Sequence, residues 1–114
     1  MQLRTIILTV GDWSTVERCR DWYAGHLGLA CSRELTGESS WLAAGEVELG
    51  FHTGRAAEAS AVTLSFVVAD VDTEVERLRA DGVEIADPAD KPGARAATTR
   101  DPAGHEVILM TRRR

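Results

Sequence analysis

The chain repeats one pattern of secondary structure, and this repeat limits its possible folds more than any other feature. The first copy begins with a strand-like segment at residues 5–10, and the second begins with a similar segment at residues 62–68. Each segment is followed by a helical pattern and then by three short strand-like pieces. A shift of 58 residues aligns Thr5 with Thr63 and also Glu48 with Glu106. The sequence therefore predicts two successive β-α-β-β-β modules.

Capping and turn residues predict where these elements begin and end. Ser14 and Glu17 have the spacing of a capping box, which predicts the start of the first helix. Gly25 and Gly28 indicate where this helix stops. In the second copy Asp72 is the expected helix cap, and Gly82 is expected to end that helix. The remaining strands are expected at residues 29–35, 41–44 and 46–53 in the first copy, and at residues 83–86, 94–100 and 105–110 in the second.

Length and composition favour one small globular domain, and the predicted order of strands and helices places it in class α+β. The 114 residues suffice for a small hydrophobic core, and 44% hydrophobic with 27% charged residues is ordinary for a soluble globular protein. We expect a single domain spanning residues 1–114, with one module at about residues 1–54 and the other at about residues 61–114. The expected fold places the two modules in a cupped mixed sheet around a ligand cavity.

Charge and hydropathy exclude several classes of partner. The formal net charge of −5 and the pI of about 5.1 argue against nucleic-acid binding, which needs a basic face. No apolar run is long enough to span a bilayer, and the first residues lack the pattern of a signal peptide. We therefore expect a cytoplasmic protein with no nucleic-acid and no membrane partner. His26 and His105 lie at predicted turns and are expected at the surface.

Alternation along the strands separates a helix-covered face from a mixed face. Leu8, Leu49 and Phe51 fall on the apolar face that the first helix can cover. The opposite face mixes polar and apolar groups, which is typical of a pocket, although such a face could also pair with another chain or with water. The predicted ligand-binding residues on that face are Thr5, Ile7, Thr9, Glu48, His52, Thr63, Ser65, Glu106, Ile108 and Met110. We add Trp41, whose flat ring at the start of a strand could stack on a planar ligand.

Several motifs resemble those of a known superfamily along nearly the whole chain. Residues 5–12 read TIILTVGD and residues 26–29 read HLGL, while the second copy carries FVVADVD at residues 66–72 and DPAGHEV at residues 101–107. This pattern resembles the vicinal-oxygen-chelate superfamily, which includes glyoxalase I, extradiol dioxygenases and bleomycin-resistance proteins. The resemblance implies two βαβββ modules that form a cupped sheet, commonly in a homodimer.

The resemblance also implies where a metal ion would be bound, and this chain departs from that pattern. Metal enzymes of the superfamily place ligands at positions that correspond here to Thr5, Thr63, Glu48 and Ile108. Threonine and isoleucine are poor ligands for divalent metals, which normally need three or four His and carboxylate donors. We therefore expect no metal and no cofactor.

Two kinds of function remain open from the sequence. The first is a non-catalytic small-molecule-binding protein that sequesters a hydrophobic or aromatic natural product in drug resistance. The acidic net charge would favour a cationic ligand for such a protein. The alternative is a metal-dependent lyase, dioxygenase or epimerase of the same superfamily, or a metal-free enzyme that uses Glu48 or Glu106 as general base.

Overall fold

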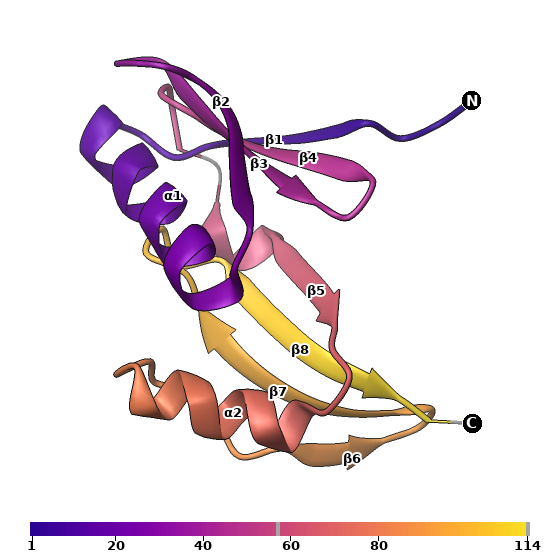
Figure 1. Cartoon of the computed structure of the whole chain (residues 1–114). Helices are drawn as coiled ribbons and strands as arrows, with labels where there is room; N and C mark the ends of the chain where they lie inside the picture. The colour runs from indigo at the N-terminus through magenta and orange to yellow at the C-terminus, as the bar shows by residue number, and fades with distance from the viewer. Residues whose placement is uncertain (57, 114) are drawn as a thin grey trace. The chain divides into compact units, whose positions relative to one another are not determined.

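The structure of the chain is a computed structural model that describes residues 1–56 and 58–113. It divides into two compact units, Met1–Ala59 and Ser60–Arg114, and within the described residues each unit holds one α-helix and one four-stranded mixed sheet (Figure 1). This confirms the predicted α+β class and the repeated β-α-β-β-β order.

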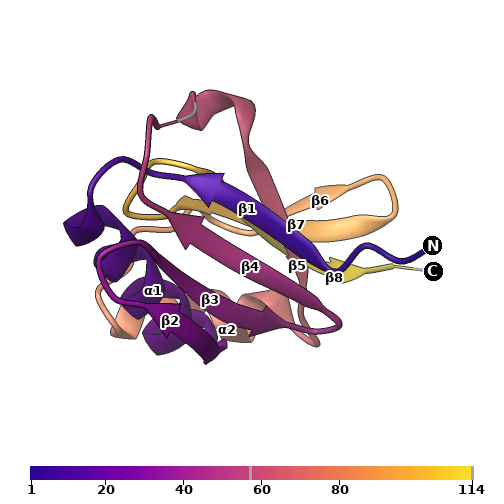
Figure 2. The same ribbon diagram turned by 90° about the horizontal axis from the view of Figure 1, so that it is seen from above.

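The first unit places its strands in the order β1-β4-β3-β2. Its elements are β1 (Thr5–Thr9), α1 (Trp13–Leu27), β2 (Ala30–Leu35), β3 (Ser39–Ala44) and β4 (Val47–His52). β1 runs parallel to β4, and the other neighbours are antiparallel, so the four strands lie side by side as Figure 2 shows. Alternation along these strands gives one face to α1 and leaves the other without a helix from this unit.

The first helix begins two residues earlier than the predicted capping box. Asp12, not Ser14, is the N-cap, and its Oδ1 accepts hydrogen bonds from the Thr15 amide at 2.9 Å and the Ser14 hydroxyl at 3.1 Å. Hydrogen bonds from Thr15 hold the pKa of the Asp12 carboxyl below its ordinary value. Of the two glycines expected near the end of the helix, Gly25 lies inside it, and Gly28 ends it with a left-handed φ of 72°.

The core of the first unit lies between α1 and its sheet. Val16, Cys19 and Tyr23 on the helix are fully buried. The Tyr23 ring stacks on Phe51 of β4 with centroids 5.2 Å apart. Leu49 is buried on the same sheet face, so the predicted apolar face is confirmed.

The second unit repeats this topology with strand order β5-β8-β7-β6. Its elements are β5 (Thr63–Val67), α2 (Val71–Ala80), β6 (Ala89–Lys91), β7 (Ala94–Arg100) and β8 (Glu106–Arg112), preceded by the short helix η1 (Ala59–Ala61). The register is also repeated. Thr5 pairs with Glu48 in the first sheet, and Thr63 pairs with Glu106 in the second, which is the alignment that the 58-residue shift predicts.

Two predictions for the second unit are wrong. Asp70, not Asp72, caps α2, while Asp72 instead accepts two hydrogen bonds from Arg95. Residues 83–86 form no strand, although Ile85 is buried and the Ala86 amide donates to the Thr98 carbonyl at 3.0 Å. Pro88 has no N–H to continue a ladder from this segment, so regular pairing with β7 begins only at Ala89.

The core of the second unit lies on the α2 face of its sheet. Val75 and Leu78 of α2 are buried with Val107 and Leu109 of β8 and Ala97 of β7. Because side chains alternate along a strand, the residues of β7 and β8 that adjoin these buried ones in sequence face away from α2. No helix among the described residues is long and apolar enough to cross a membrane.

Candidate ligand-binding groove

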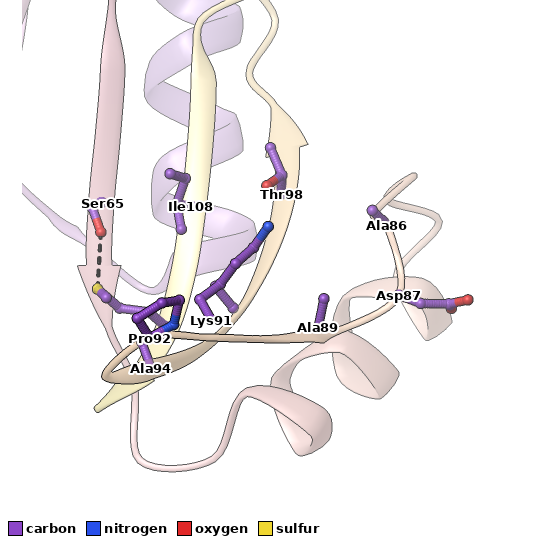
Figure 3. Close-up of a pocket in the computed structure, with 11 residues that line it drawn as sticks. Ser65, Ala86, Asp87, Ala89, Lys91, Pro92, Ala94, Thr98 and Ile108 are labelled. Carbon is purple, nitrogen blue, oxygen red and sulfur yellow. Dashed lines mark hydrogen bonds between the residues drawn. The ribbon is translucent and has the colours of Figure 1, made fainter. Parts of the chain in front are cut away.

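A groove of about 510 Å³ lies in the second unit, on the sheet face away from α2 (Figure 3). Its base comes from alternate residues of three strands, and its wall comes from the segment that leads into and out of β6. The lining residues are Ser65, Ala86, Asp87, Ala89, Lys91, Pro92, Ala94, Ala96, Thr98, Ile108 and Met110. We call this site the β6–β8 groove.

Small side chains and two turns explain why the sheet is hollowed here. Four of the lining residues are alanines, which leave room above the strands. Pro92 and Gly93, with φ of 76° at the glycine, join β6 to β7 by a two-residue turn. This turn holds the short β6 strand beside β7, and the irregular segment before Ala89 completes the wall.

The chemistry of the β6–β8 groove is mainly apolar with a few polar groups. Ile108 and Met110 supply the larger apolar surface, and the Ser65 hydroxyl donates to the Met110 sulfur at 3.2 Å. Asp87 accepts a hydrogen bond from Arg79 at 2.7 Å, and Figure 3 shows its carboxylate directed away from the other lining residues. An apolar lining with a few polar groups is typical of sites for small organic molecules.

The structure places the predicted residues of the second unit on one sheet face. Ser65, Ile108 and Met110 line the groove. Thr63 and Glu106 share the face by register but are not part of the groove lining, and the Thr63 hydroxyl donates to Glu106 Oε1 at 3.1 Å. The predicted set thus divides into residues inside the groove and a pair beyond it.

The predicted residues of the first unit also share one sheet face. Thr5 pairs with Glu48 and Thr9 pairs with His52, while Ile7 lies between them and is 51% exposed. Glu48 accepts a hydrogen bond from the Ser32 hydroxyl at 2.8 Å and lies 3.6 Å from Arg33 Nε. The His52 Nε2 atom is buried and has no hydrogen-bond partner among the described residues.

Trp41 lies on this face but is only 7% exposed. Its ring packs so closely on Gly50 that a Cβ there would approach ring carbon Cζ3 to 2.6 Å. The Arg33 guanidinium lies 4.2 Å from the ring centroid, and the His52 ring meets the indole edge-on at 5.0 Å. A planar ligand could therefore stack on Trp41 only after Arg33 had moved away.

The residues at the expected metal positions do not fit a divalent metal ion. The Thr63 hydroxyl is engaged by Glu106, and Ile108 has no donor atom. Within the part of the chain that the structure describes, no group of three or more His, Cys, Asp or Glu side chains could hold a metal.

His26 and His105 differ from the sequence expectation. His26 lies in the last turn of α1, and its ring contacts Trp22 edge-on. His105 is 2% exposed, and its Nδ1 lies 2.8 Å from Oδ2 of the buried Asp101. Asp101 and His105 both lie in the turn between β7 and β8.

Sequence reasoning missed most of the groove wall and part of its base. Ala94, Ala96 and Thr98 could have been assigned to the same face as Ile108, because residues 94–100 were predicted as a strand and alternate in the same way. The wall could not have been found in that way, since residues 86–88 have no regular period.

A comparison with known protein families identifies the family of this chain. The glyoxalase-like domain family matches residues 9–110. The chain belongs to the glyoxalase-like domain family. Members of the vicinal-oxygen-chelate superfamily are also found among solved structures that resemble it, and a comparison with curated proteins finds no match.

Three solved structures illustrate the range of proteins that share the fold of this glyoxalase-like domain. TnmS3, an antibiotic-binding protein from Streptomyces sp. CB03234, is 21% identical with a TM-score of 0.81, covering 99% of this chain and 97% of its own. Lactoylglutathione lyase from Agrobacterium tumefaciens is 19% identical with a TM-score of 0.80, and the match covers 96% of this chain and 92% of the lyase. Oxidase ChaP-H2 is 26% identical with a TM-score of 0.77, and the match covers 99% of this chain and 94% of the oxidase.

Proposed function

We propose that this glyoxalase-like domain binds a hydrophobic or aromatic small molecule, and that it sequesters a natural product of this kind in drug resistance. The β6–β8 groove carries the proposal, because its volume of about 510 Å³ and its alanine-lined base suit a compact organic ligand. The antibiotic-binding protein TnmS3, which shares the fold, is consistent with this use.

The arrangement of the carboxylates favours binding over catalysis. Glu106 accepts a hydrogen bond from Thr63 and lies outside the groove lining, so it is not placed to take a proton from a ligand held there. Glu48 is held by Ser32 and Arg33. A metal-free enzyme with one of these groups as general base remains the alternative, and a metal-dependent lyase, dioxygenase or epimerase would need donors that Thr63 and Ile108 do not supply.

The proposal includes the cytoplasmic homodimer expected from the sequence. Ile7 and Val67 are 51% and 56% exposed on sheet faces that their own units leave without a helix. Burial of such side chains against a second copy would be favourable. Light scattering after size-exclusion chromatography tests the dimer directly.

Filling the groove should abolish most of the binding. Ala96 lies on the groove base, so Ala96→Phe places a ring in the space that a ligand would occupy. The test titrates the protein with phenylnaphthylamine (NPN), an uncharged aromatic probe whose fluorescence rises in apolar sites. We expect the Ala96→Phe substitution to weaken NPN binding about tenfold or more, which corresponds to a loss of about 1.4 kcal/mol in binding free energy.

Ala80→Phe is the matched control, because Ala80 is an exposed residue at the end of α2 and does not line the groove. This variant should bind NPN as the unchanged protein does. Equal affinity of the Ala96→Phe variant and the unchanged protein would contradict the proposal, as would the absence of any NPN binding.

A further inference from the structure

We infer that the ligand of the β6–β8 groove carries a negative charge, as a carboxylate, sulfonate or phenolate on an aromatic body, and that Lys91 selects it. The inference rests on the proposed function and names the chemical class of its ligand. It also runs against the expectation from net charge, which favours a cation.

Lys91 is the only lysine in the chain. Arginines pair with the acidic residues Asp72, Asp87 and Asp90, and Lys91 takes part in none of these ion pairs. Among the described residues, Lys91 has neither a hydrogen bond nor an ion pair. A cation in this position can accept a ligand without first breaking a contact within the protein.

The backbone places Lys91 at the edge of the groove. It is the last residue of β6 and pairs with Ala94 across the two-residue turn. Figure 3 shows its side chain extended over the strands, with the nitrogen directed towards Thr98. The ammonium and the Thr98 hydroxyl are therefore suited to hold one polar group of a ligand whose body covers the alanines.

The acidic residues near Lys91 are paired with arginines. Asp87 is bound by Arg79 and points away from the groove. Asp90, whose side chain alternates to the other side of β6 from Lys91, pairs with Arg95 and Arg113. The positive charge of Lys91 is thus left without a carboxylate partner in the groove.

This local charge should outweigh the net charge of the protein for a bound ligand. Charges farther away than about 8 Å are largely screened at physiological ionic strength. An anionic group beside Lys91 would gain a charge-assisted hydrogen bond, which is stronger than a neutral one. A cationic group in the same place would be repelled.

The test uses two probes that differ by one anionic group. Anilinonaphthalene sulfonate (ANS) has the ring system of NPN with an added sulfonate, so the ratio of the two affinities isolates the anionic group. Lys91→Met removes the ammonium from an exposed side chain of similar length. We expect the ratio of ANS affinity to NPN affinity to fall about three- to tenfold in this variant.

Two controls separate a local effect from a general one. Arg77→Met removes one positive charge from α2 outside the groove and should leave the ratio unchanged. Reductive methylation with carbon-13 formaldehyde labels Lys91, the only lysine, together with the α-amino group, and the signal missing from the Lys91→Met variant identifies Lys91. This signal should shift on addition of ANS. The shift should be lost in the Ala96→Phe variant.

The outcomes distinguish this inference from the proposed function. If NPN binds and Ala96→Phe abolishes that binding, but Lys91→Met leaves the affinity ratio unchanged, the selection of an anion is wrong and the groove stands. If neither probe binds the unchanged protein, both proposals are wrong.

Discussion

Replacing Asp101 with alanine should lower the free energy of unfolding by about 3 kcal/mol. The Asp101 side chain is fully buried, and its Oδ1 accepts from the backbone amides of Ala103 at 2.9 Å and His105 at 3.0 Å. Its Oδ2 lies 2.8 Å from His105 Nδ1. Alanine would leave the buried His105 amide, the part-buried Ala103 amide and a buried imidazole without this partner, in the turn that leads into β8.

The measurement is urea denaturation followed by circular dichroism, with two comparison variants. Asp101→Asn keeps one acceptor oxygen for the backbone amides and should lose much less stability. Asp87→Ala removes an exposed partner of Arg79 and should have a small effect, because surface ion pairs contribute little. A loss in Asp101→Ala no larger than that in Asp87→Ala would show that the buried pair does not hold this turn.

Replacing Gly50 with alanine should lower the free energy of unfolding by about 2 kcal/mol. The new Cβ would lie 2.6–2.9 Å from three atoms of the Trp41 ring, so the ring must move. Trp41 is buried between Gly50 and the Arg33 guanidinium, and a shift would disturb both this packing and the edge-on contact with His52. Thermal and urea denaturation measure the loss.

Gly25→Ala is the matched control for this substitution. Gly25 lies inside α1, its φ is not positive, and nothing lies within 4 Å of an added Cβ. Alanine is the better helix former by about 1 kcal/mol, so Gly25→Ala should stabilise the protein. If Gly50→Ala is as stable as the unchanged protein, the close contact with Trp41 does not constrain this sheet face.

Much of the fold could be predicted because its signals are local and repeated. Residues 94–100 alternate regularly and form β7 with the predicted bounds. Asp12 and Asp70 lie 58 residues apart and cap the two helices, so the repeat marks the caps even though Ser14 and Asp72 were chosen from shorter motifs. An aspartate just after a strand and a serine or aspartate two positions later are equally good N-cap residues. Only the path of the backbone decides which of the two begins the helix.

The site could be predicted only in part, because it depends on a segment without a regular period. Ser65, Ile108 and Met110 were found from strand alternation and line the groove. Residues 83–86 resemble a strand in sequence, but the proline at position 88 moves the regular pairing to Ala89–Lys91. The position of Lys91 over the groove follows from that displaced strand, and it was not evident from the sequence.

Chemical-shift mapping with NPN tests whether the β6–β8 groove is the binding site. The nitrogen-15 spectrum of the full chain is recorded during a titration with NPN, and shifted amides are assigned to residues. Binding in the β6–β8 groove predicts the largest shifts at lining residues such as Ser65, Ala96 and Thr98. If the largest shifts are confined to the first unit, around Trp41 and His52, the ligand does not bind in the β6–β8 groove.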